Sequence, residues 1–138
     1  MTFDLRNWNE KRVLVVGDIM LDVFKEGKIK RINPESPASQ LIDIQTTREC
    51  LGGAANVANN LAALGCAVTL HGIAKDDHAG MRMQELSDSA HINLIMHDDG
   101  RRTTVKTRLV ETTMYHQIAR VDEEDSHKIT KEFAEEVF

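Results

Sequence analysis

The sequence is poor in the residues that mark several classes of protein. It has two cysteines and two prolines among 138 residues, and aromatic residues make up only 4%. Two cysteines are too few for a disulfide framework or a zinc site, and no C-x-x-C or H-x-x-x-H spacing accompanies them. The six histidines show no short metal-ligand spacing either. We therefore assign no metal ligand.

Long apolar runs and a dense basic face are also missing. No run approaches the roughly 20 apolar residues that cross a bilayer, and residues 1–12 contain no apolar core of signal-peptide length. We expect a cytoplasmic protein with no membrane partner. The formal net charge of -5 argues against nucleic acid as a partner, because phosphate binding favours a basic surface.

What is present indicates an α/β fold, with 41% hydrophobic and 28% charged residues. Residues 12–17, RVLVVG, form a β-branched run typical of a parallel strand buried on both faces. Residues 23–51 read as two alternating strands around a turn that contains both prolines, and we expect them to form a lid outside the main sheet. Gly52 and Gly53 then open a helix that Gly65 closes.

The second half of the chain continues the alternation. Residues 67–96 read as strand, helix and strand, which favours a parallel sheet. Residues 103–111 and 115–123 predict two more strands, and a helix is expected from an N-cap at Ser126 to Phe138. We take residues 1–138 as part of one domain, with the lid inserted at about 23–51.

Two features at the edge of the predicted sheet have the chemistry of a binding site. Asp18 and Asp22 follow the carboxyl end of the first strand, where open α/β sheets place ligands. Gly52 and Gly53 precede a helix, so the backbone can approach a ligand while free helix amides point toward it. Capping is the alternative for the aspartates, and a tight structural loop is the alternative for the glycines.

The segment GGAANVANNLAALG resembles the N-terminal signature of the ribokinase and PfkB carbohydrate kinase family, although Lys75 stands where that pattern has a glycine. With VLVVGDIMLD, RINPESP and TTVKTRLV in their order along the chain, the sequence is most similar to the heptose 7-phosphate kinases of that family. The resemblance implies a ribokinase-like doubly wound, mainly parallel sheet with a small β-lid, of which this chain is the N-terminal portion.

The resemblance also implies an activity. It is the ATP-dependent phosphorylation of a sugar phosphate, D-glycero-D-manno-heptose 7-phosphate, to the 1,7-bisphosphate used in ADP-heptose and lipopolysaccharide core biosynthesis. The implied cofactors are ATP and Mg. Related lids pair with one another, and edge strands offer unpaired backbone groups for such pairing, so we expect a homodimer through the lid.

Five sugar-binding residues follow from the resemblance, motif by motif. Asp18 and Asp22 would accept hydrogen bonds from sugar hydroxyls, because a carboxylate offers only acceptors. Gly52 and Gly53 would close over the same sugar through their backbone amides. Asn56 would contribute the donor and the acceptor of its side-chain amide.

The later strands supply four more expected contacts. Lys106 and Arg108 are two residues apart on a predicted strand, so they point to one face and could hold the 7-phosphate. An exposed basic strand face is the alternative. Gln117 and Arg120 resemble the polar run that closes this region in the heptose kinases.

The family's catalytic base is an aspartate in a GAGD motif, which does not occur in these 138 residues. We expect the base and the nucleotide pocket outside this chain, and no kinase activity from the chain alone. One alternative is a non-catalytic sugar-binding or dimerisation module derived from a PfkB kinase. Another is a nucleotide-binding Rossmann domain, which does not account for the whole lid between the first strand and the glycine loop.

Overall fold

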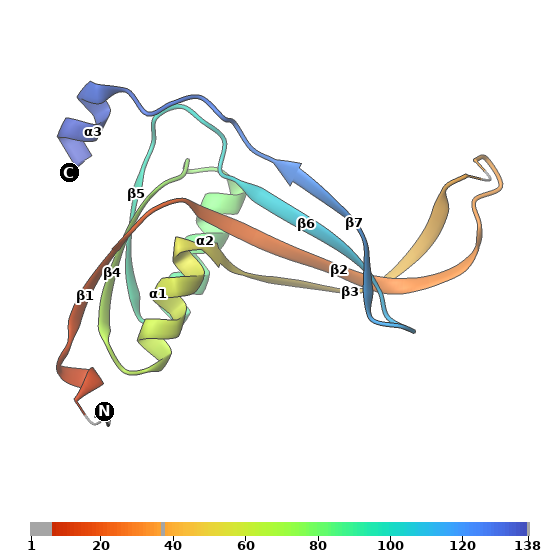
Figure 1. Ribbon diagram of the computed structural model, residues 1–138, viewed down its shortest axis with the longest axis horizontal. Coiled ribbons are helices and arrows are strands. Elements are labelled where there is room, and N and C mark those ends of the chain that lie inside the picture. The colour runs from red at the N-terminus through yellow and green to blue at the C-terminus, as the bar shows by residue number, and fades with distance from the viewer. Residues whose placement is uncertain (1–6, 37, 138) are drawn as a thin grey trace, which may run out of the picture.

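The computed structural model describes residues 7–36 and 38–137. The strands in chain order are β1 (Arg12–Val16), β2 (Ile19–Ile32), β3 (Gln40–Gly53), β4 (Ala67–Ile73), β5 (Ile92–His97), β6 (Val105–Glu111) and β7 (His116–Glu123). The helices are α1 (Ala54–Ala63), α2 (His78–Ser89) and α3 (Lys131–Val137), preceded by a short 3-10 helix, Trp8–Glu10. Figure 1 shows a sheet with helices at one end and a long arm of strands at the other.

The first sheet has the order β1-β4-β5, and all of its strand pairs are parallel. Both crossovers lead the same way across it, and right-handed connections therefore place α1 and α2 on one face (Figure 1). The core between this face and the helices includes Leu70, Ala58 and Met83, all fully buried. Gly65, with φ +96, follows α1 and ends it as expected.

The prediction that β1 is buried on both faces is wrong. Along β1, Val13 and Val15 pack against the core, whereas Leu14 and Val16 are 61% and 46% exposed. The reason is the helix arrangement, because α1 and α2 cover the same face of this sheet. A β-branched run shows that a strand is apolar on both sides, but it does not show which sides are covered.

The second sheet is the lid, with the order β3-β2-β6-β7. β2 pairs antiparallel with β3 and parallel with β6, and β6 pairs antiparallel with β7. The two strands of the excursion expected at 23–51 are longer than that range and run from Ile19 to Gly53. Asp22 therefore lies within β2 and not in a loop after β1. The two later strands, β6 and β7, belong to this same sheet.

One face of the lid attaches it to the rest of the molecule. Ile19, Leu21 and Val23 alternate along β2 and are buried in the core together with Leu51 of β3. Because alternate residues of a strand point to opposite faces, Met20, Asp22 and Phe24 lie on the other side. We call this second side the polar face of the lid and define it by Asp22, Phe24, Arg48, Lys106 and Arg108.

The last helix begins later than the sequence indicates. Ser126 is not its N-cap, because α3 starts at Lys131 and the Thr130 hydroxyl accepts a hydrogen bond from the Phe133 amide at 3.2 Å. Thr130 thus satisfies a free amide of the first turn, the role that the prediction gave to serine. Phe138, the predicted helix end, and Pro37 of the lid turn lie outside the described residues.

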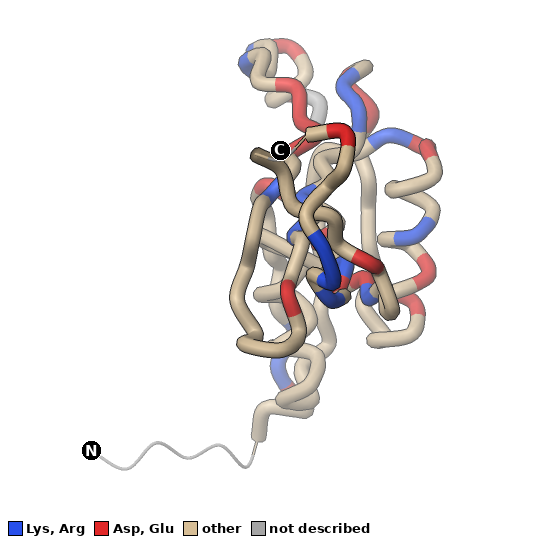
Figure 2. Tube along the Cα trace, turned by 90° about the vertical axis from the view of Figure 1, so that its right-hand side faces the viewer, with Lys and Arg blue, Asp and Glu red and all other residues tan. Residues whose placement is uncertain are grey.

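In residues 7–36 and 38–137, no helix is both long and apolar enough to cross a membrane. Acidic and basic residues are interleaved along the chain, and neither sign gathers in one region of the view in Figure 2.

Candidate functional site

The site is built at the corner where β1 passes into the lid and β3 passes into α1. The Ala54 amide donates to the Asp18 carbonyl oxygen at 2.8 Å, which joins the two passages directly. Gly53 has φ +58, and a Cβ there would lie 2.4 Å from the same carbonyl oxygen. Glycine permits both the positive φ and this close backbone approach. The predicted aspartate and glycine segments therefore meet at one point.

Gly52 leaves room for the Asp22 carboxylate. A Cβ at Gly52 would lie 2.6 Å from Asp22 Oδ2, so the side chain of Asp22 passes directly over this glycine. The other carboxylate oxygen accepts a hydrogen bond from the Arg108 guanidinium. Both side chains are largely buried, with 17% and 23% of their surface exposed. An ion pair on β2 and β6 thus fixes the carboxylate beside the glycine pair.

Lys106 lies on the same face, directly opposite Asp22 in the strand pairing. Its ammonium contacts Glu124 at 2.9 Å and Asp122 at 3.1 Å, and these hydrogen bonds raise the pKa of Lys106. Burial alone would raise the pKa of Asp122, but hydrogen bonds from Arg120 and Lys106 hold it below its ordinary value. Lys106 is therefore a charged group whose charge is already matched by two acids.

The start of α1 offers donors to the same corner. Gly53, its N-cap residue, has no side chain to cap the helix, and Asn56 in the first turn is exposed. The Ala54 amide is bonded to Asp18, but later first-turn amides without a capping side chain can bind ligand oxygens, which the positive end of the helix favours. The structure thus places Asn56 and these amides after the same glycines that border Asp18 and Asp22.

A cavity of about 390 Å³ opens at this corner. Asp18, Met20 and Lys106 line it, together with Arg101. Arg101 donates three hydrogen bonds of 2.5–2.9 Å to Asp99, which lower the pKa of Asp99. The same hydrogen bonds raise the pKa of Arg101, and the charge of Asp18 adds a smaller rise. Sequence reasoning missed Arg101, because its place beside Asp18 follows from the turn after β5 and from no motif.

The two remaining predicted residues lie farther out along the lid. Arg120 is opposite Arg108 but is bound to Asp122 by two hydrogen bonds of 2.8 and 2.9 Å. Gln117 is exposed near the tip of the β6–β7 hairpin, opposite Val110. Arg120 therefore shares the polar face with the corner residues, whereas the structure does not bring Gln117 to Asp18 and the glycine pair.

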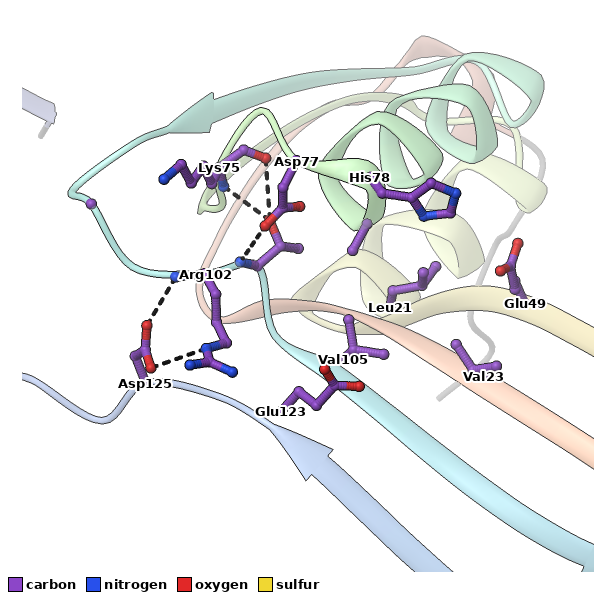
Figure 3. A pocket seen from close by; sticks show the side chains of 13 residues that line it. Leu21, Val23, Glu49, Lys75, Asp77, His78, Arg102, Val105, Glu123 and Asp125 are labelled. Carbon is purple, nitrogen blue, oxygen red and sulfur yellow. Dashed lines mark hydrogen bonds and ion pairs between the residues drawn. The ribbon is translucent and has the colours of Figure 1, made fainter.

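A larger cavity, about 680 Å³, lies on the opposite face of the lid (Figure 3). Its polar groups hold the local structure together. Asp77 caps α2 through the Gly80 amide at 2.9 Å and accepts a second bond from the Thr103 amide at 3.1 Å. Asp125 is held by the Arg102 amide at 3.0 Å. Because these acids are already engaged, we place the candidate site at the corner where Asp18, Asp22 and the glycine pair meet. Of these residues, Asp18 lines the smaller cavity.

A family model described as pfkB family carbohydrate kinase matches residues 10–138. The chain is 38% identical over 133 residues to a protein called bifunctional protein HldE from Desulfatibacillum aliphaticivorans, which covers 95% of this chain and 27% of that protein. It is 43% identical over 123 residues to a protein of the same name from Caulobacter sp. (strain K31), covering 87% of this chain and 24% of that one. The chain thus spans about a quarter of the length of these relatives.

Solved structures agree on the fold. A carbohydrate kinase from Agrobacterium tumefaciens superposes with a TM-score of 0.63 at 22% identity, over 82% of this chain and 35% of that one. A ribokinase from Cryptococcus neoformans var. grubii serotype A in complex with ADP gives 0.61 at 21% identity, over 88% of this chain and 36% of that one. The fold is therefore ribokinase-like, with the parallel sheet and the β-lid described above.

Proposed function

Because the chain belongs to the pfkB family of carbohydrate kinases, we propose that it supplies the sugar-binding half and the lid of a kinase that phosphorylates a sugar phosphate. The proposed substrate is D-glycero-D-manno-heptose 7-phosphate, converted to the 1,7-bisphosphate for ADP-heptose and lipopolysaccharide core biosynthesis. The order of motifs along the chain and the HldE relatives support this choice. The proposed place of the reaction is the cytoplasm, where ATP is available.

The observation that carries the proposal is the convergence of Asp18, Asp22 and the glycine pair at one corner. Carboxylates accept the hydrogen bonds that sugar hydroxyls donate, and backbone amides supply the complementary donors. The hydrogen bond from Arg108 holds the Asp22 carboxylate in place, so that its remaining lone pairs can accept from a hydroxyl. Asn56, at the start of α1, adds both a donor and an acceptor. This set of groups suits a neutral polyhydroxylated ring.

Phosphoryl transfer also requires an acceptor hydroxyl held in line with the γ-phosphate, a base and charge stabilisation. In this proposal the corner binds and orients the acceptor. ATP and its Mg supply the phosphoryl group and neutralise charge when they are bound. We assign the base and the nucleotide pocket to the part of a kinase that the longer relatives have and that residues 1–138 do not cover.

We also propose that the lid forms a homodimer. β3 is an edge strand of the lid along its whole length of 14 residues. A long edge strand presents unpaired amides and carbonyls, which a second lid can pair with. Exposed Ile32 and Ile44 lie on the distal part of β2 and β3, where such a partner would dock.

The test is calorimetric titration of this chain with D-glycero-D-manno-heptose 7-phosphate, for the wild type and for Asn56→Ala and Leu61→Ala. Asn56 is exposed, so its truncation should weaken sugar binding about tenfold with little change in stability, since a hydrogen bond to a ligand contributes roughly 1 kcal/mol. Leu61 packs against the core, and its truncation should lower the free energy of unfolding by about 2 kcal/mol. Equal losses of stability in both variants would contradict the assignment of Asn56.

A phosphorylation assay tests the kinase role separately. The chain, and the chain extended to the next stop codon of its gene, are incubated with ATP, Mg and the heptose 7-phosphate. Activity of the extended protein alone supports the proposal. Sugar binding without activity in either form would favour a non-catalytic sugar-binding module, and the absence of binding would exclude both.

A further inference from the structure

Phe24 lies between two arginines on the polar face of the lid. It sits on β2, directly opposite Arg48 of β3 on one side and Arg108 of β6 on the other. The guanidinium carbon of Arg48 is 4.2 Å from the centre of the Phe24 ring, and that of Arg108 is 5.3 Å away. Three strands therefore bring two cations over one aromatic ring.

The cations of this face differ in how well acids neutralise them. Lys106 contacts two carboxylates within 3.1 Å, and Arg108 is paired with Asp22. Arg48 is neutralised much less, because its acidic neighbour, Glu26, is 3.9 Å away and its other polar contact is Cys50 Sγ at 4.0 Å. Its side chain is 55% exposed. Among the described residues of the polar face, Arg48 is the cation most available to an external anion.

The ring gives Arg48 an orientation. A guanidinium stacked over an aromatic ring gains cation–π attraction and keeps its plane fixed, so that its fork of N–H donors faces outward. Such a fork binds two oxygens of a phosphate through two parallel N–H···O bonds, whereas an ammonium acts as a point charge without this planar geometry. The second guanidinium, on Arg108, is already ordered by Asp22 and lies across the same ring.

The spacing along β2 fits a sugar phosphate. Asp22 and Phe24 point to the same face, and two residues of a strand span roughly 7 Å, which is about the length of a sugar ring. A ring whose hydroxyls reach Asp22 would thus place a phosphate on its far side over Phe24. We propose that Arg48, together with Arg108, forms the phosphate subsite, and that Arg48 determines the preference for a phosphorylated over an unphosphorylated sugar. This inference rests on the proposed function.

The test compares two ligands on the wild-type chain and its Arg48→Gln variant. Titration with D-glycero-D-manno-heptose 7-phosphate should show Kd raised about tenfold or more by Arg48→Gln, because a charge-assisted bidentate contact is lost. The Kd for D-glycero-D-manno-heptose without phosphate should stay unchanged. Inorganic phosphate should compete with the sugar phosphate and not with the free sugar.

Two further variants separate the role of Arg48 from charge and folding. Lys30→Gln removes another lid cation, which is paired with Asp43 at 2.5 Å, and should change neither Kd. Arg48→Lys keeps the charge and should give a Kd for the sugar phosphate between those of the wild type and Arg48→Gln. A thermal melt of each variant establishes that it is folded. If Arg48→Gln does not fold, Arg48→Lys and the phosphate competition still decide the question.

The outcomes distinguish this inference from the proposed function. Wild-type binding of neither sugar would overturn both. Wild-type binding of both sugars, with equal effects of Arg48→Gln on the two, would overturn the phosphate subsite and leave the sugar site standing. An equal effect of Lys30→Gln and Arg48→Gln on the sugar phosphate would also overturn it, because general charge attraction would then explain the binding.

Discussion

Gly52 shows how a single residue shapes the candidate site. The backbone of Gly52 does not require glycine, because its φ is not positive, whereas the φ of Gly53 is. What it requires is space, since a Cβ would lie 2.6 Å from Asp22 Oδ2 and 2.8 Å from Met20 Cγ. The absence of a side chain at Gly52 therefore sets the position of the Asp22 carboxylate.

Gly52→Ala should weaken binding of the sugar phosphate about tenfold, because the added methyl group pushes Asp22 off its position beside Arg108. The same crowding should lower the free energy of unfolding by about 1–3 kcal/mol. Titration calorimetry and urea unfolding measure the two effects. Asp22→Asn is the matched control for binding, and wild-type affinity in Gly52→Ala would contradict the space argument.

The site residues that the sequence could predict are those carried by short continuous motifs. Asp18 and the glycine pair were recognised because each lies in one run of residues, and the structure brings them together. Arg48 and Arg101 were missed, since their importance depends on what lies across from them. Cross-strand register decides that Arg48 faces Phe24, and no local pattern reports register over a hairpin this long.

At the scale of elements, the β6–β7 hairpin is closed by a buried carboxylate. Glu111 ends β6, and its oxygens accept hydrogen bonds from the amides of Thr113 at 2.8 Å and Met114 at 2.9 Å. The turn is also joined to the lid, because the Thr112 amide donates to the Gly27 carbonyl at 2.9 Å. The Thr113 hydroxyl and these two amides hold the pKa of Glu111 at about 2, well below its ordinary value of 4.5.

Glu111 should therefore make the stability of the chain depend on pH. The folded pKa lies below the unfolded one, so the stabilisation is complete above about pH 5 and is lost as the pH falls toward 2. Urea unfolding at pH 7 should show Glu111→Gln less stable than the wild type, and the difference should shrink at pH 3. The exposed Glu35→Gln is a control and should change stability by less than about 0.5 kcal/mol at either pH. A difference for Glu111→Gln that does not vary with pH would contradict this role.

Whether a segment forms a helix or a strand was predictable, because the spacing of its apolar residues differs between the two. The strands at β1, β4 and β5 and the helices at α1 and α2 lie where the sequence placed them. Ser126 is the predicted cap of the last helix, but the structure has Thr130 in that role, and both residue types suit it. Local sequence also does not predict which face of β1 is buried, because that depends on which face of the sheet the helices occupy.

The overall shape of the molecule depends on a strand pairing that no local sequence pattern predicts. β6 pairs in parallel with β2, so residues far apart in sequence, such as Asp22 and Lys106, become direct neighbours. The lid is consequently a four-stranded sheet and not the two-stranded excursion expected from residues 23–51. Its polar face, which combines residues of β2, β3, β6 and β7, exists only because of this pairing.

Two surfaces of this molecule are able to associate, and they should do so differently. The edge strand β3 with Ile44 favours an ordered pair of lids, because backbone hydrogen bonds fix the register of the contact. The exposed face of β1, with Leu14 and Val16, is apolar, and apolar contacts do not fix the register or orientation of a partner. Ile44→Glu should therefore convert a dimer into a monomer in sedimentation velocity, because a charge on an edge strand opposes pairing.

Leu14→Glu is the matched control, since it places the same charge on an exposed apolar strand position outside the lid. It should leave the dimer intact and reduce larger, irregular aggregates. A dimer that survives Ile44→Glu but is lost in Leu14→Glu would move the interface from the lid to the parallel sheet. That result would contradict the lid dimer without affecting the sugar site, because Leu14 and Ile44 both lie outside the cavity at Asp18.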